Sequence, residues 1–285
     1  MMKSGFITLV GRSNVGKSTL LNTLIGTKIA AVTHKPQTTR NILHGVLNAP
    51  EGQAVFVDTP GVFKEHGGPI AGKLEQRVHE SMQDIDLIVY VVDPTKSLGE
   101  EERYIQSTLR KTSVPVMLVV NKSDLPEKEK TYLDDYLNLD IDFVETMQLS
   151  ALLNRHVEPL RQNVFKYLPE GEAMYPDGEI TNVSREFWMA EVIREKVFLA
   201  LRQEVPYSVH VEVESVEMNE NKDTLKIKAI VFTISSKYKK MIIGAKGRSI
   251  KEIGIAARKE LETAMNMKIY LELEVEKDAH WEERM

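Results

Sequence analysis

An octapeptide near the start of the chain constrains the fold more than any other stretch of the sequence. It has the spacing G-x-x-x-x-G-K-S of a phosphate-binding loop and consists of Gly11, Arg12, Ser13, Asn14, Val15, Gly16, Lys17 and Ser18. Residues 6–10 predict a buried strand before it, and residues 19–26 predict an amphipathic helix after it. Because glycines let backbone N–H groups curl around phosphate oxygens at a helix start, this context predicts a nucleotide-binding P-loop domain.

The loop assigns chemical roles to its last residues. In such a loop Lys17 reaches the β- and γ-phosphates, and the Ser18 hydroxyl binds Mg²⁺. The polar segment 33–40 contains Thr38 and Thr39. Nucleotide switches place a metal-binding, γ-phosphate-sensing threonine about twenty residues after the lysine. The sequence does not decide which of the two threonines would bind the metal. The alternative interpretation of this segment is a solvated loop.

A second phosphate-side motif follows a predicted β-hairpin of residues 41–49 and 54–57. It consists of Asp58, Thr59, Pro60 and Gly61. A carboxylate at this strand end is expected to lie beside the magnesium ion, and the Gly61 N–H is expected to donate to the γ-phosphate. The alternative is an aspartate that only caps a turn. Val62 stands where Ras-like enzymes carry a water-orienting glutamine. We therefore expect slow hydrolysis, or a water positioned by other groups.

A third motif predicts which base is bound. Apolar strands at 87–92 and 114–120 precede Asn121, Lys122, Ser123 and Asp124. A carboxylate at position 124 can accept both N1–H and the exocyclic amine of guanine, a donor pair that adenine lacks. Asn121 would bind the base and link neighbouring loops, while the Lys122 stem covers a ring face. After a last strand at 143–149, the backbone N–H groups of Ser150 and Ala151 are candidates to meet the guanine carbonyl.

Strands alternate with predicted helices at 73–84, 100–111 and 157–168. This order predicts an α/β fold for residues 1–168, a doubly wound and mostly parallel sheet with ligand loops at the strand carboxyl ends. Residues 169–184 are rich in Pro, Gly and acidic residues and predict a linker.

The remaining residues, 185–285, predict an α+β domain. Helices are expected at 185–204, 238–243 and 248–265, and alternating strands at 209–216, 225–234 and 268–275. The order α-β-β-α-α-β, with Ile-Ile-Gly-x-x-Gly between two helices, is typical of a type II KH domain. In such domains the G-x-x-G loop holds the backbone of single-stranded nucleotides.

Charge supports a nucleic-acid site at this loop. Residues 237–251 contain six Lys or Arg and no acidic residue, although residues 180–285 contain eighteen charges of each sign. A solvated lysine face beside a glycine turn is the alternative. The candidate RNA-binding residues are Lys239, Lys240, Ile243, Gly244, Ala245, Lys246, Gly247 and Arg248.

Composition limits the other functions. The 285 residues carry a net charge of −5 and no cysteine, which excludes disulfides and thiolate metal sites and confines any nucleic-acid contact to a local patch. No apolar run has the length of a membrane span. The first residues run directly into the first predicted strand, without space for a signal peptide, so a cytoplasmic protein is expected.

With both halves considered, the chain closely resembles the Era family, bacterial Ras-like GTPases of the TrmE–Era–EngA type with a C-terminal KH domain. The resemblance implies hydrolysis of GTP to GDP and phosphate with Mg²⁺. It also implies that this cycle controls KH binding to the 3′ end of 16S rRNA during assembly of the small (30S) ribosomal subunit. It rests on residues 11–18, 37–40, 58–61, 121–124, 193–196, 205–208 and 241–247.

The resemblance also suggests catalytic roles and a monomer. Relatives with an asparagine at the place of Asn14 can use K⁺ to supply transition-state charge, and a hydrophobic residue replaces the glutamine, as Val62 does. The candidate catalytic residues are Asn14, Lys17, Thr38, Thr39 and Gly61. The sequence departs from the family pattern at residues 63–66, and at Asn154, where a glycine is usual.

Two other functions stay open from the sequence. The chain could be an RNA-binding scaffold that uses GTP mainly as a sensing ligand. It could also be a GTPase that associates peripherally with the inner face of the cell membrane through its basic patch. No amphipathic anchor with exposed aromatic residues accompanies that patch.

Overall fold

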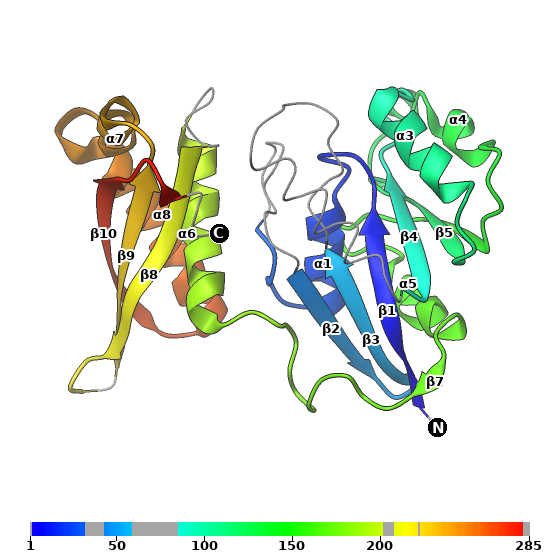
Figure 1. Ribbon diagram of the computed structural model, residues 1–285, viewed down its shortest axis with the longest axis horizontal. Coiled ribbons are helices and arrows are strands. Elements are labelled where there is room, and N and C mark those ends of the chain that lie inside the picture. The colour runs from blue at the N-terminus through cyan, green and yellow to red at the C-terminus, as the bar shows by residue number, and fades with distance from the viewer. Residues whose placement is uncertain (1, 32–42, 59–84, 202–207, 222, 282–285) are drawn as a thin grey trace. The chain divides into compact units, whose positions relative to one another are not determined.

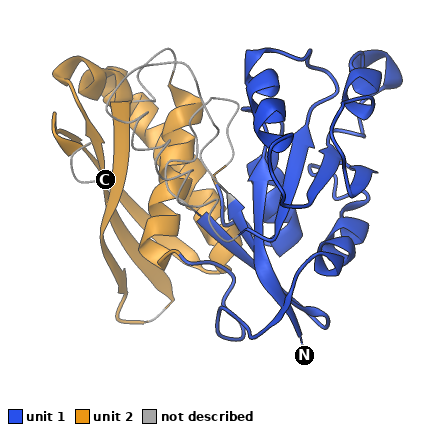
Figure 2. Ribbon diagram, turned by 45° about the vertical axis from the view of Figure 1, so that its right-hand side comes forward, with its two compact units in different colours: residues 1–30, 36–182 blue, residues 31–35, 183–285 orange. Residues whose placement is uncertain are grey.

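The computed structural model describes residues 2–31, 43–58, 85–201, 208–221 and 223–281, apart from the side chain of Asp58. The chain forms two compact units, coloured separately in Figure 2. Unit 1 consists of residues 1–30 and 36–182, and unit 2 of residues 31–35 and 183–285. Unit 1 carries the phosphate loop and unit 2 carries the G-x-x-G loop. The domain limits at residues 168 and 184 stay a prediction.

Unit 1 is built on one mostly parallel sheet, with strand order β2-β3-β1-β4-β5-β6 (Figure 1). Along this path of described strands, β2 runs antiparallel to its neighbour β3, as a hairpin, and the four other pairings are parallel. The strands are β1 (Met2–Val10), β2 (Leu43–Ala49), β3 (Gly52–Asp58), β4 (Leu87–Val92), β5 (Val116–Val120) and β6 (Glu145–Gln148).

Helices cover both faces of this sheet. Every residue of β4 is buried. Alternate residues Ile88, Tyr90 and Val92 pack with α3 (Glu100–Leu109) and α4 (Leu133–Leu137). Two further helices of this unit, α1 (Lys17–Ile25) and α5 (Val157–Asn163), contact each other. A strand buried on both faces needs apolar residues at every position, which explains the continuous apolar sequence at 87–92.

Several elements differ from the sequence-based expectation. Strand β1 begins at Met2 rather than at residue 6, because it pairs with β3 from Lys3 onward. The last predicted helix of unit 1 ends at Asn163 and continues as a 3₁₀ turn, Val164–Lys166. Helix α4 was not predicted, since five residues are too few to show a helical period. The predicted loop at 33–40 and helix at 73–84 lie outside the described residues.

The segment predicted as a linker, residues 169–184, belongs mostly to unit 1 and pairs with its sheet at several points. Strand β7 (Glu170–Gly171) pairs antiparallel with the start of β1. Further along, the Val46 N–H donates to the Ile180 carbonyl at 2.9 Å, and the His44 N–H donates to Asn182 Oδ1 at 2.9 Å. Residues 170–171 therefore extend the sheet beside β1, and residues 180–182 cover the β2 edge. A Pro- and Gly-rich composition does not reveal either pairing.

In the described residues of unit 2, a three-stranded sheet packs with three α-helices. Its strand order is β10-β9-β8; β8 and β9 are antiparallel, whereas β9 and β10 are parallel. Helix α6 was predicted to bury a single apolar face, but Arg194 and Glu195 are buried as well. The additional burial arises because the helix contacts both α8 and β8. The elements are α6 (Arg185–Ala200), β8 (Val209–Met218), β9 (Thr224–Thr233), α7 (Ser236–Ile243), α8 (Arg248–Met265) and β10 (Lys268–Lys277).

Within the described part of the chain, no helix combines the length and the apolar character that crossing a membrane requires.

Candidate functional site

The phosphate loop connects β1 to α1, and its backbone depends on glycine. A Cβ at Gly11 would lie 2.2 Å from the Val91 carbonyl oxygen, and a Cβ at Gly16 would lie 2.3 Å from Asn121 Nδ2. Gly16 also has a φ of 102°, in the left-handed region that side chains disfavour. The loop can therefore approach its neighbours this closely only with glycine at both positions.

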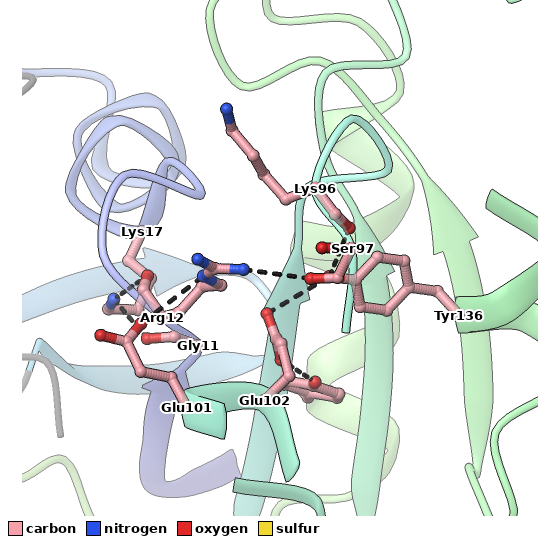
Figure 3. Close-up of polar contacts among 9 residues, drawn as sticks. Gly11, Arg12, Lys17, Lys96, Ser97, Glu101, Glu102 and Tyr136 are labelled. Atoms are coloured by element: carbon pink, nitrogen blue, oxygen red, sulfur yellow. Dashed lines mark hydrogen bonds and ion pairs between the residues drawn. The ribbon is translucent and has the colours of Figure 1, made fainter. Parts of the chain in front are cut away.

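Lys17 lies inside the curve of this loop (Figure 3). Its Nζ donates to the carbonyl oxygens of Gly11, at 2.6 Å, and Arg12, at 3.0 Å. Helix α1 begins here with no side-chain cap and no acidic residue in its first turn. The helix dipole and a buried ammonium group thus act at one place, which favours an anion such as a phosphate.

Asn121 connects three loops at the carboxyl edge of the sheet. Its Nδ2 donates to the Val15 carbonyl at 2.8 Å, and its Oδ1 accepts from the Ala151 N–H at 2.9 Å. The phosphate loop, the 121–124 loop and the 150–155 loop are thereby held together, although more than a hundred residues separate the first from the other two. Such a fixed arrangement can bind a base and its phosphates at the same time.

The 150–155 loop differs in detail from the expectation. The N–H groups predicted to meet guanine already have acceptors in the protein: Ser150 donates to the Arg155 carbonyl at 3.0 Å, and Ala151 donates to Asn121. A ligand contact at either N–H would have to be shared with these acceptors. Asn154 adopts a left-handed φ of 51°, so this asparagine takes a backbone conformation that glycine adopts most readily.

Asp124 is half-buried beside this loop. Among the residues that the structure describes, none donates a hydrogen bond to its carboxylate. The Asp124 carboxylate can therefore accept hydrogen bonds from a ligand.

Some predicted residues lie outside the described part of the chain: Thr38, Thr39, Thr59, Pro60, Gly61 and Val62. Asp58 ends β3, but its side chain is not described. For Mg²⁺, the half-buried Ser18 in the first turn of α1 offers a hydroxyl oxygen, which fits the preference of this ion for oxygen. The described residues contain no group of three or more His, Cys, Asp or Glu that could hold a metal. A magnesium ion bound mostly through phosphates does not require one.

The G-x-x-G loop of unit 2 is also shaped by glycine. Gly244 has φ 72° and ψ 175°, a backbone region that is essentially restricted to glycine. A Cβ there would lie 2.7 Å from Ser249 Cβ. Helix α8 begins after Gly247 with no side-chain cap and no acidic residue in its first turn. The loop therefore ends at a helix start suited to phosphates.

Six cations of residues 237–251 lie on α7, on the loop and on the first turn of α8. Among the described residues, no carboxylate forms an ion pair with any of these six side chains. Ile242 is fully buried and anchors the loop in the core, whereas Ile243 is only partly buried. Lys239 is half-buried, and the exposed cations are Lys237, Lys240, Lys246, Arg248 and Lys251.

The structure adds contacts of the phosphate loop that the sequence motifs did not predict. Arg12 of the phosphate loop donates to the Ser97 carbonyl at 3.2 Å and pairs with Glu101 at 3.5 Å (Figure 3). Next to it, burial raises the pKa of Glu102, although Tyr90 and Tyr136 donate hydrogen bonds to its carboxylate.

Asp93, which directly follows β4, is a functional candidate that the sequence motifs did not include, because it forms an ion pair with Lys122. The signal that could have found it is a carboxylate at the end of a buried strand, the criterion that selected Asp58.

Comparison with known proteins decides the family. A model described as 50S ribosome-binding GTPase matches residues 6–122, and a KH domain model matches residues 204–281. GTPase Era of Halothermothrix orenii is 39% identical over 282 residues, which cover 99% of this chain and 95% of that protein. The chain belongs to the Era family of GTPases. GTPase Era of Carboxydothermus hydrogenoformans is 40% identical over 280 residues, covering 98% of this chain and 94% of that protein.

Solved structures of Era are similar to this chain over nearly its full length. A crystal structure of Era in complex with MgGDPNP and nucleotides 1506–1542 of 16S ribosomal RNA has a TM-score of 0.90 at 34% identity, covering 100% of this chain and 96% of that chain. A variant of Aquifex aeolicus Era bound to GDP and AlF₄⁻ also scores 0.90 at 34% identity, covering 99% and 96%. The predicted Era resemblance, and the predicted order of a P-loop GTPase domain followed by a KH domain, are confirmed.

Proposed function

We propose that this chain binds GTP with Mg²⁺, hydrolyses it to GDP and phosphate, and uses its nucleotide state to control RNA binding by the KH domain. The RNA proposed is the single-stranded 3′ end of 16S rRNA, bound during assembly of the 30S subunit. One observation carries the proposal: about 40% identity to GTPase Era over 98–99% of the chain. That span includes both the phosphate loop and the G-x-x-G loop.

Within this proposal the contacts with the nucleotide and its metal ion are divided among four segments of the chain. The N–H groups and Lys17 of the phosphate loop bind the phosphates, and Asn121 and Asp124 recognise guanine. Ser18, Asp58 and one of Thr38 and Thr39 hold Mg²⁺, with Gly61 near the γ-phosphate. Because Val62 cannot orient water, hydrolysis depends on positioning and charge stabilisation by these groups. An RNA-directed role of this kind belongs in the cytoplasm.

The RNA contacts are assigned to the basic surface at the start of α8. Five of its six cations are exposed, and none of the six has a described carboxylate partner, so the exposed ones can neutralise phosphates at little desolvation cost. Each phosphate neutralised on a single strand contributes about 0.7 to the slope of log affinity against log salt. This surface therefore predicts RNA binding that weakens as salt rises.

The direct test measures RNA affinity of the full chain with GDP and with a non-hydrolysable GTP analogue. The ligand is a single-stranded oligonucleotide that copies the 3′ end of small-subunit RNA, at fixed salt. Tighter binding with the analogue is expected. Equal binding in both states would contradict the proposed coupling and would leave the KH domain as an unregulated tether.

A matched pair of variants tests the RNA surface itself. Lys246→Ala should weaken binding and lower the salt slope by about 0.7. Lys268→Ala is the control, because Lys268 follows the opposite end of α8, a helix of 18 residues and about 27 Å. Equal losses in the two variants would mean that the predicted surface is not the binding site.

Turnover measurements separate the GTPase from a scaffold that only senses GTP. We expect slow turnover that rises with K⁺ and not with Na⁺, since Asn14 is the candidate K⁺ ligand, and that rises further with RNA. Hydrolysis that stays negligible with both K⁺ and RNA present would favour the scaffold.

A further inference from the structure

Asp93 is a buried carboxylate at the ligand edge of unit 1 that none of the sequence motifs includes. It directly follows β4 and its exposed fraction is 1%. Its two oxygens have separate partners. Oδ1 accepts from the Thr95 N–H at 3.0 Å and from Thr95 Oγ1 at 2.8 Å, whereas Oδ2 accepts from Lys122 Nζ. The Thr95 contacts fix the carboxylate, and the fixed carboxylate holds the lysine.

The lysine that it holds belongs to the proposed base-binding loop. Lys122 has a left-handed φ of 61°, and its carbonyl accepts from the Leu125 N–H at 3.1 Å. The neighbouring Ser123 N–H donates to the Leu149 carbonyl at 3.0 Å. The backbone of Lys122 is therefore fixed at one end and its ammonium at the other, so the four-carbon stem between them has little freedom.

The charge state of Asp93 suits this role. Burial would raise its pKa, but hydrogen bonds from Lys122 and Thr95 outweigh burial and hold the pKa below its ordinary value. The carboxylate is therefore ionised at neutral pH and pairs with the ammonium as an ion. A charge-assisted contact of this kind is stronger than a neutral hydrogen bond.

We propose that Asp93 is a positioning residue for the nucleotide base: through Lys122 Nζ it fixes the lysine stem as a preformed wall of the guanine pocket. The inference rests on the proposed guanine site at residues 121–124. Ordering a long side chain before the ligand arrives removes that entropy cost from binding. Asp93 thus raises guanine-nucleotide affinity without touching the nucleotide.

Asp93→Asn isolates the contact. The amide oxygen can still accept from Thr95, whereas the amide nitrogen faces the Lys122 ammonium and cannot accept from it. The dissociation constant for GDP should rise about tenfold, mainly through faster release. Asp142→Asn is the matched control, because Asp142 is exposed on the same unit, and its GDP affinity should stay within twofold. Wild-type GDP affinity in Asp93→Asn would overturn the inference.

A double-mutant comparison distinguishes positioning from general stability. If Asp93 acts through Lys122, Asp93→Asn should add less than about twofold in a Lys122→Met background. An equal loss of affinity in both backgrounds would mean that Asp93 only stabilises the fold, and would overturn the inference.

Two single variants give a test that does not change Asp93. Lys122→Arg keeps a cation for Asp93, whereas Lys122→Met keeps only an apolar stem and should lose about tenfold in GDP affinity. The loss in Lys122→Arg should be smaller than the loss in Lys122→Met. Equal affinities would show that the anchor is not needed. Thermal unfolding of each variant confirms that it is folded.

The wild-type protein separates this inference from the function on which it rests. If the wild type binds GDP no better than ADP, the proposed guanine site fails. If the wild type strongly prefers GDP and Asp93→Asn retains that affinity, only the role of Asp93 fails.

Discussion

The side-chain amide of Asn121 donates a hydrogen bond of 2.8 Å to the backbone carbonyl of Val15, 106 residues earlier in the chain. This bond is buried and joins the base-binding loop to the phosphate loop. Through its Oδ1 the same amide also accepts from Ala151. One side chain therefore sets the spacing between the parts of the site proposed to bind the base and the phosphates.

Asn121→Asp should destabilise unit 1 by about 2–3 kcal/mol, because the carboxylate can still accept from Ala151 but now faces the Val15 carbonyl, leaving a buried acceptor without its donor. Denaturant unfolding of the full chain measures the change. Asn138→Asp is the control, since Asn138 donates to the Asp134 carbonyl at the same distance of 2.8 Å but is exposed. A comparable loss in both variants would show that burial of the bond does not matter.

Gly244→Ala should destabilise unit 2 more than Gly247→Ala does. Both glycines have positive φ, but only Gly244 would place a Cβ against Ser249, at 2.7 Å. For Gly247, nothing lies within 4 Å of an added Cβ, so its cost is the left-handed backbone alone, about 1–2 kcal/mol. Thermal unfolding of the two variants provides the comparison. The reverse order would contradict the geometry of the loop.

Gln53→Leu should release residues 174–175 from the sheet of unit 1. Gln53 is fully buried; its Oε1 accepts from the N–H groups of Met174 and Tyr175 at 2.7 and 2.9 Å, and its Nε2 donates to the Tyr175 carbonyl at 2.9 Å. Removing these bonds should cost about 1–3 kcal/mol of unfolding free energy.

Hydrogen exchange at the Met174 and Tyr175 amides reports the release directly. Gln162→Leu, at an exposed position on α5, should leave their protection unchanged. Unchanged protection in Gln53→Leu as well would mean that other contacts hold the segment.

Unit 1 should lose stability as pH falls below about 6.5, because burial lowers the pKa of His44 from its ordinary value of 6.5. The unfolded chain then takes up a proton more readily than the folded chain, so the contribution is present above the unfolded pKa and is lost as pH drops toward the folded one. Unfolding of the wild type and His44→Gln at about pH 7.5 and 5.5 measures it. An equal pH dependence in both proteins would exclude His44 as its source.

The sequence by itself determined the order of the longer described elements and the positions of the nucleotide and KH motifs, but not the short elements α4 and β7. The 87–92 strand was predictable because burial on both faces forces apolar residues at every position. The strand and helix around residues 11–18 were predictable because local spacing carries that signal. Helix α8 was predicted with the limits that the structure has, Arg248–Met265.

Only the tertiary structure decided which distant groups meet. The bonds from Asn121 to Val15, from Asp93 to Lys122 and from Gln53 to Tyr175 join residues that are 106, 29 and 122 positions apart. Strand periodicity predicts which face a side chain occupies, but a partner on another strand or loop depends on sheet order and register. For that reason the motifs identified the candidate ligand-binding residues, whereas Asp93, which holds one of them in place, became visible only in the folded chain.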